Sequence, residues 1–198
     1  MKEVKQPHYL ENFVQCIFDS LPASELTGST LVLSGDGRYH NKDAAIMIMR
    51  MAAANGVKKI ITGENAIMST PCVSGVIRSA KAYGGIILTA SHNPGGPVSH
   101  TQIHCERASH LRQHRGLPSD CVDLCVHVCV CFPFQDADFG IKYNCSNGGP
   151  APEALTDAMF AKSKTITQYK ITKQTPEVSG ENKARLSRHL SMRFVLHT

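Results

Sequence analysis

The sequence predicts an α/β fold around a largely parallel sheet, because strand and helix patterns alternate along its first half. Residues 30–40, 57–63 and 85–90 each contain a short apolar strand, and the first of these strands runs into a glycine turn. Helical patterns at 42–56 and 69–84 separate the strands. Strands joined by helices at such short spacing pair in parallel through right-handed crossovers.

Each predicted helix has its own local signal. Residues 8–21 carry apolar side chains at every third or fourth position, which indicates an amphipathic helix. The helix at 42–56 is rich in Ala and Met and has Gly56 as its stop. The helix at 69–84 begins with a Ser/Thr cap and has Pro71 in its first turn.

The composition is that of a folded protein. Of the 198 residues, 42% are hydrophobic and 19% are charged, and the net charge is +5. Lys and Arg are scattered, so we expect no nucleic-acid partner. No apolar run approaches the roughly 18 residues that span a bilayer, and the start of the chain does not resemble a secretory signal. We therefore expect a cytoplasmic protein with no membrane partner and no disulfides.

The regular patterns break between residues 98 and 136. This atypical insertion is expected to be irregular or disordered, and two interpretations of it stay open. Its Cys and His side chains could bind zinc, although their spacing differs from paired C-x2-C motifs. Alternatively, the segment is non-coding sequence translated in frame, because its composition differs from both flanks. The side chains concerned are His110, His114, Cys121, Cys125, His127, Cys129 and Cys131.

Regular patterns return with a strand at 138–144 and a helix at 152–163. The tail at 172–198 is polar, lacks a core-forming face and is expected to be loosely ordered.

Two loops leave the predicted strands and are expected to meet at the carboxyl edge of the sheet: residues 34–38 and 89–94. In the second loop, Ser91 can act as a nucleophile or phosphate carrier. His92 can move a proton or donate to a phosphate oxygen. The glycines at 95–96 let amide groups approach an anion. The same residue types also form simple turns, so the residues alone leave both interpretations open.

The segments TASHNPGGP, DFGIKYN and SNGGPAPEALTD resemble the signature of the phosphoglucomutases, in the α-D-phosphohexomutase superfamily. The SGDGR turn, the AAANGV helix end and the STP helix start are similar to this family as well. The resemblance covers roughly 5–97 and 137–171. It implies one domain formed by 1–97 and 137–171. It also implies a three-layer α/β/α sandwich with a mostly parallel mixed sheet, as in domain I of these enzymes.

The resemblance implies an isomerase that converts glucose 1-phosphate to glucose 6-phosphate by intramolecular phosphoryl transfer. Ser91 matches the serine whose phosphate forms glucose 1,6-bisphosphate with the substrate. His92 and Lys142 match two further catalytic positions, and Asn93 and Arg38 match substrate-binding positions. The family also implies Mg²⁺ bound to Ser91 through its phosphate.

The sequence departs from the family in lacking a DGDGD-type carboxylate loop. We therefore expect the protein ligands of Mg²⁺ to be missing and this chain not to turn over by itself. Its expected partner is a hexose phosphate, and its expected state is a monomer. The alternatives are a non-catalytic scaffold or binding protein, or a zinc-binding module in 98–136.

Overall fold

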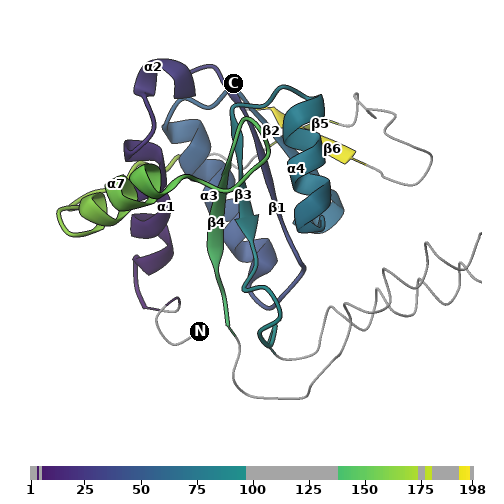
Figure 1. The fold of residues 1–198 in the computed structure, drawn as a ribbon, viewed down its shortest axis with the longest axis horizontal. Coiled ribbons are helices and arrows are strands. Elements are labelled where there is room, and N and C mark those ends of the chain that lie inside the picture. The colour runs from purple at the N-terminus through teal and green to yellow at the C-terminus, as the bar shows by residue number, and fades with distance from the viewer. Residues whose placement is uncertain (1–3, 5, 97–137, 174–176, 180–191, 197–198) are drawn as a thin grey trace, which may run out of the picture.

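The computed structural model is organised around one mixed sheet with helices on both faces (Figure 1). It describes residues 4, 6–96, 138–173, 177–179 and 192–196. The predicted insertion at 98–136 lies outside these residues, and so does the hypothesis of a zinc site within it. The strand order is β4-β3-β1-β2-β6-β5.

Four strands form the part of the sheet that the sequence predicts. They are β1 (Thr30–Gly35), β2 (Lys59–Gly63), β3 (Gly84–Leu88) and β4 (Ile141–Cys145). β1 lies between β3 and β2 and pairs in parallel with both, which confirms the crossover argument. β4 pairs with β3 in the antiparallel direction, so the sheet is mixed.

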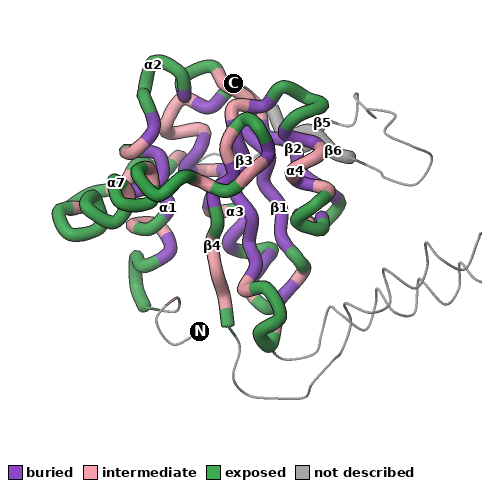
Figure 2. The backbone as a smooth tube through the Cα atoms, in the orientation of Figure 1, coloured by how far each residue is buried: buried purple, intermediate pink, exposed green. Residues whose placement is uncertain are grey.

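Helices cover both faces of the sheet (Figure 1). Their bounds are Tyr9–Asp19 for α1, Asn41–Ala54 for α3, Thr70–Ser79 for α4 and Glu153–Ser163 for α7. Leu31 and Leu33 of β1 pack in one apolar cluster with α1 and α3, whereas Val32 packs with α4. α7 lies against α1 and has no buried residue (Figure 2). This arrangement is the three-layer α/β/α sandwich that the resemblance implies.

The helix boundaries follow the predicted caps. The side chain of Ser69 accepts the backbone N–H of Cys72 at 3.4 Å, and Pro71 stands in the first turn of α4. After α3, Gly56 has a φ of 88°, which a helix-ending glycine adopts without strain. Sequence analysis missed two one-turn helices, α2 (Ala23–Leu26) and η1 (Glu64–Ala66), because they are too short for any periodicity.

The tail contributes two strands, β5 (Glu177–Ser179) and β6 (Met192–Leu196). β6 pairs antiparallel with β2, and β5 pairs antiparallel with β6. The structure describes only these two segments and residues 172–173 of the tail, so its expected loose order stays a prediction. Without β6, β2 would be an edge strand whose unpaired backbone N–H and C=O groups could pair with any segment that reaches them.

Candidate active site

The site lies where two parallel strands end side by side. β1 and β3 are neighbours, with Gly35 opposite Leu88. From there the chain leaves β1 toward β2 and leaves β3 toward β4, on opposite sides. Such a divergence marks a switch point at the carboxyl ends of the strands, where open α/β sheets generally bind ligands. The two loops are joined across it, because Asp36 N–H donates to the carbonyl of Leu88 at 3.2 Å and Tyr39 N–H to that of Gly95 at 2.8 Å.

Ser91 occupies a strained turn directly after β3. Asn93 N–H donates to the carbonyl of Ala90 at 3.1 Å, which makes Ser91 the second residue of a four-residue turn. Its φ is 56°, a left-handed conformation that costs a non-glycine residue about 1–2 kcal/mol. The backbone N–H of Ser91 donates to the hydroxyl of Thr89 at 3.1 Å. The surrounding contacts therefore hold an unfavourable backbone geometry at an exposed serine.

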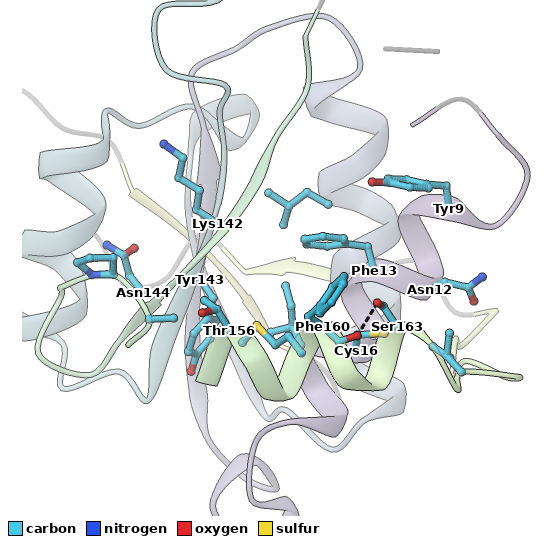
Figure 3. Close-up of a pocket in the computed structure, with 16 residues that line it drawn as sticks. Tyr9, Asn12, Phe13, Cys16, Lys142, Tyr143, Asn144, Thr156, Phe160 and Ser163 are labelled. Carbon is cyan, nitrogen blue, oxygen red and sulfur yellow. Dashed lines mark hydrogen bonds between the residues drawn. The ribbon is translucent and has the colours of Figure 1, made fainter. Parts of the chain in front are cut away.

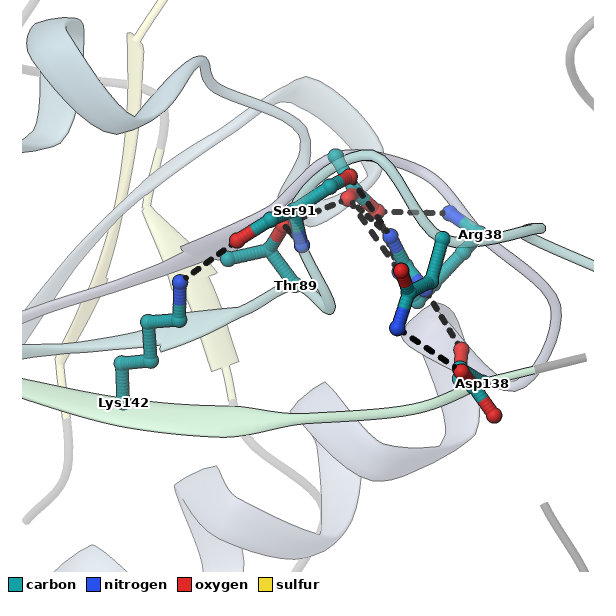
Figure 4. A network of polar contacts seen from close by, with 7 residues as sticks. Arg38, Thr89, Ser91, Asp138 and Lys142 are labelled. Atoms are coloured by element: carbon teal, nitrogen blue, oxygen red, sulfur yellow. Dashed lines mark hydrogen bonds and ion pairs between the residues drawn. The ribbon is translucent and has the colours of Figure 1, made fainter.

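Lys142 comes from β4 and contacts this serine. Its Nζ donates to Ser91 Oγ at 2.9 Å (Figure 4). The antiparallel register places Lys142 opposite Ile87, near the end of β3. Both Lys142 and Ser91 are exposed. Among the described residues, Lys142 forms no ion pair with a carboxylate, so its charge is available to an anion on Ser91.

A charged network contacts the loop beside Ser91 (Figure 4). Two nitrogens of Arg38 donate hydrogen bonds to the carboxylate of Asp36. Nη2 lies 2.7 Å from Oδ2, and Nε lies 2.9 Å from Oδ1. Thr89 Oγ1 donates to the same carboxylate at 2.7 Å. The side chain of Arg38 is only 3% exposed, so Asp36 supplies the counter-charge that this burial requires. The network fixes the two strand ends relative to each other.

The structure brings most of the predicted site residues together. Besides Asp36, Arg38 donates to the carbonyl of Ser91 at 3.5 Å and to the carbonyl of Asp138. Asn93 donates to Asp138 Oδ2 at 2.8 Å. His92 lies exposed on the same loop, without a hydrogen bond to another described residue. Arg38 and Asn93 are thus hydrogen-bonded to protein groups, whereas His92 is exposed to solvent.

Sequence analysis missed three members of this network: Asp36, Thr89 and Asp138. The first stands two positions before an arginine in a Gly-Asp-Gly turn at a strand end, a signal that could have been used. Thr89 is a polar residue at the end of an apolar strand. No local pattern marks Asp138 as a partner of the first loop, because that contact joins residues 100 positions apart.

The described residues do not complete a Mg²⁺ site. No group of three or more His, Cys, Asp or Glu side chains among them could hold a metal ion. The carboxylate of Asp36 is already bound by Arg38 and Thr89. Mg²⁺ prefers several carboxylate and water oxygens in octahedral geometry. We therefore derive no step through the metal from these residues.

A separate apolar cavity of about 730 Å³ lies between α1, β4 and α7 (Figure 3). Tyr9, Phe13 and Phe160 line it, and Phe160 is 63% exposed. Lys142 contributes to the wall, but its Nζ bonds Ser91 Oγ instead. Burial raises the pKa of the Cys16 thiol beside this cavity, which disfavours the reactive thiolate. Apart from Lys142, none of the predicted site residues lines this cavity.

Comparison with known proteins identifies the family. The sequence model described as phosphoglucomutase/phosphomannomutase, alpha/beta/alpha domain I, matches residues 1–103. The chain belongs to the phosphoglucomutase/phosphomannomutase family. It is 45% identical over 180 residues to a cytoplasmic phosphoglucomutase of Bromus inermis, covering 88% of this chain and 24% of that protein.

Two further phosphoglucomutases support this assignment. Phosphoglucomutase-1 of Dictyostelium discoideum is 44% identical over 171 residues, which cover 86% of this chain and 23% of that protein. The open form of parafusin, a phosphoglucomutase from Paramecium, superposes with a TM-score of 0.66 at 36% identity, covering 87% of this chain and 25% of that one. The chain thus spans about a quarter of the length of these phosphoglucomutases. None of the described helices is both long and apolar enough for a membrane crossing.

Proposed function

We propose that this chain supplies the phosphoryl-carrying domain of a phosphoglucomutase, with Ser91 as the carrier. The observation behind the proposal is the 2.9 Å contact between Lys142 Nζ and Ser91 Oγ on an exposed, strained turn. A phosphorylated serine carries a charge of about −1.5 to −2 at pH 7. Lys142 places a positive charge where that phosphate would lie.

The proposed reaction moves one phosphoryl group out and another back. A sugar hydroxyl of glucose 1-phosphate attacks the phosphorus on Ser91, the bond to Ser91 Oγ breaks, and glucose 1,6-bisphosphate forms. The bisphosphate turns over, and Ser91 Oγ attacks its other phosphoryl group. Glucose 6-phosphate leaves, and Ser91 is phosphorylated again. The proton lost by the attacking hydroxyl returns to the oxygen that leaves, so the cycle balances.

Two side chains are proposed to assist this transfer. Lys142 stabilises the charge that shifts onto Ser91 Oγ when the phosphorus–oxygen bond breaks. His92, exposed on the same loop, is proposed to exchange protons with the sugar hydroxyl or to donate to a phosphate oxygen. Arg38 and Asn93 are proposed to contact the substrate. For that contact, each has to exchange a protein partner that it holds in this structure.

The rest of the proposal concerns the whole protein. We propose a hexose phosphate substrate, a monomeric state, a cytoplasmic location, and neither a nucleic-acid nor a membrane partner. A Mg²⁺ ion on the phosphate of Ser91 would neutralise charge during the transfer, with carboxylate ligands from outside the described residues. We also propose that this chain does not turn over alone, since it spans about a quarter of its relatives.

Transfer of phosphate to Ser91 tests the proposal directly. The purified chain is incubated with glucose 1,6-bisphosphate and Mg²⁺, and phosphopeptides are identified by mass spectrometry. Phosphate is expected on Ser91, absent in S91A and retained in S146A, a matched change of an exposed serine on another loop. No incorporation at Ser91 would contradict the carrier role and favour the scaffold alternative. A coupled assay with glucose 1-phosphate then tests the expected lack of turnover.

A further inference from the structure

The turn that contains Ser91 has a known support at its beginning. There the hydroxyl of Thr89 accepts the N–H of Ser91 and is itself bonded to Asp36. A left-handed serine persists only where the surrounding structure over-determines its backbone conformation. The question is what restrains the end of the turn, at Asn93 and Pro94.

Asp138 forms three hydrogen bonds in this region, two of them at that end of the turn. Its carboxylate accepts the side-chain amide of Asn93 at 2.8 Å, and its backbone N–H donates to the carbonyl of Pro94 at 2.9 Å. Its own carbonyl accepts from Arg38, the residue that also reaches the carbonyl of Ser91. Asp138 is thus bonded both to the end of the turn and to Arg38 of the charged network (Figure 4).

We propose that Asp138 is a positioning residue for Ser91, acting through Asn93. We call the side-chain bond between these two residues the Asn93–Asp138 clasp. With Thr89 at the start and the clasp at the end, the turn is restrained on both sides of Ser91. The bonds of Asp138 also join the chain on either side of residues 97–137. The described residues therefore suffice to hold both ends of the Ser91 loop, and Asn93 has a role in the protein before any substrate binds.

Amide hydrogen exchange of the full chain tests the clasp without any assumption about activity. The reporters are the N–H groups of Asn93 and Tyr39, which bond to Ala90 and Gly95 in the loop. In D138A their exchange is expected to rise about three- to tenfold, which is modest because the bond is exposed. D138N, which can still accept from Asn93, should show a smaller rise. D157A, an exposed aspartate on α7, is the matched control and should leave both reporters unchanged.

The double variant N93A/D138A separates a clasp from two independent structural effects. The N–H of Tyr39 is the reporter here, because N93A changes residue 93 itself. If the two side chains act as one pair, Tyr39 N–H in the double variant exchanges no faster than in D138A alone. The inference would be overturned if the increases in exchange rate caused by N93A and D138A multiplied in the double variant. It would also be overturned if D138A exchanged no faster than D157A.

A second readout rests on the proposed function. The rate at which glucose 1,6-bisphosphate phosphorylates Ser91 is expected to fall about three- to tenfold in D138A and less in D138N. If the unmodified chain takes up no phosphate, the carrier proposal fails, while the exchange experiment still decides on the clasp. Faster exchange with an unchanged phosphorylation rate would show that Asp138 stabilises the loop without positioning Ser91, and would overturn the inference.

Discussion

Lys142 Nζ lies 2.9 Å from Ser91 Oγ although 51 positions separate the two residues. The contact exists because β4 returns antiparallel alongside β3 and brings Lys142 to the strand end from which Ser91 departs. A serine in a left-handed turn thereby faces a cation that has no described carboxylate partner. We propose that this pair is the chemical centre of the site.

Replacing Lys142 by alanine is expected to slow the phosphorylation of Ser91 about a hundredfold, because the charge on the transferring group loses its nearest cation. The measurement is the rate of phosphate incorporation from glucose 1,6-bisphosphate. K58A is the matched control, since Lys58 is exposed just before β2, at the opposite end of the sheet. Equal rates in both variants would remove Lys142 from the mechanism.

Asp36→Asn is expected to lower the free energy of unfolding by about 2 kcal/mol. The substitution leaves the guanidinium of Arg38, 3% exposed, without its counter-charge. The estimate is below the cost for a fully buried pair because the side chain of Asp36 is 29% exposed. Urea unfolding measures the change. D43N, at a carboxylate that is 75% exposed, should cost less than about 0.5 kcal/mol, and a similar loss in both would argue against the network.

Thr89→Val keeps the shape of a buried side chain and removes its hydroxyl. That hydroxyl accepts from Ser91 N–H and donates to Asp36. We therefore expect the free energy of unfolding to fall by about 1–2 kcal/mol and the phosphorylation of Ser91 to slow. T89S retains the hydroxyl and should recover most of the phosphorylation rate. The idea fails if T89S and T89V are phosphorylated equally slowly.

Gly35 has no room for a side chain. A Cβ there would lie 2.0 Å from Asn41 Oδ1 and 2.5 Å from the backbone oxygen of Leu88. G35A is therefore expected to destabilise the domain by about 1–3 kcal/mol. Among the described residues, a Cβ at Gly75 on α4 would meet nothing within 4 Å other than its chain neighbours and the backbone of its own helix, so G75A should stabilise the domain by about 0.5–1 kcal/mol. Thermal unfolding of the two variants should shift in opposite directions.

The stability of the fold should decrease at high pH through Tyr83. Burial, reinforced by a hydrogen bond with Glu25, raises the pKa of Tyr83 from 10.0 to about 12. The folded state thus binds the phenolic proton more tightly than the unfolded chain. This contribution is complete below pH 10 and is lost as the pH rises through about 12. Y83F should flatten the decline of the unfolding free energy between pH 10 and about pH 12. An unchanged slope would contradict the role of Tyr83 in this decline.

Much of the fold could be predicted because its signals are local. The apolar period of α1, the Ser69 cap of α4 and the glycine that follows α3 each depend on residues within a turn of one another. Alternation along β1 then divides the core into two layers, since successive side chains of a strand point to opposite faces. Parallel pairing followed from the short crossovers.

Only the tertiary structure decided which side chains meet. Asp138 carries no distinctive local pattern, and the local patterns of Asp36 and Thr89 do not reveal their partners, yet the three residues hold the turn of Ser91 through bonds that span 45 to 100 positions. The β6 segment likewise joins the sheet through backbone pairing at an edge. Helix and strand signals are short-range and can be recognised in the sequence. Hydrogen-bond partners at the ends of strands depend on where the whole sheet brings those ends together.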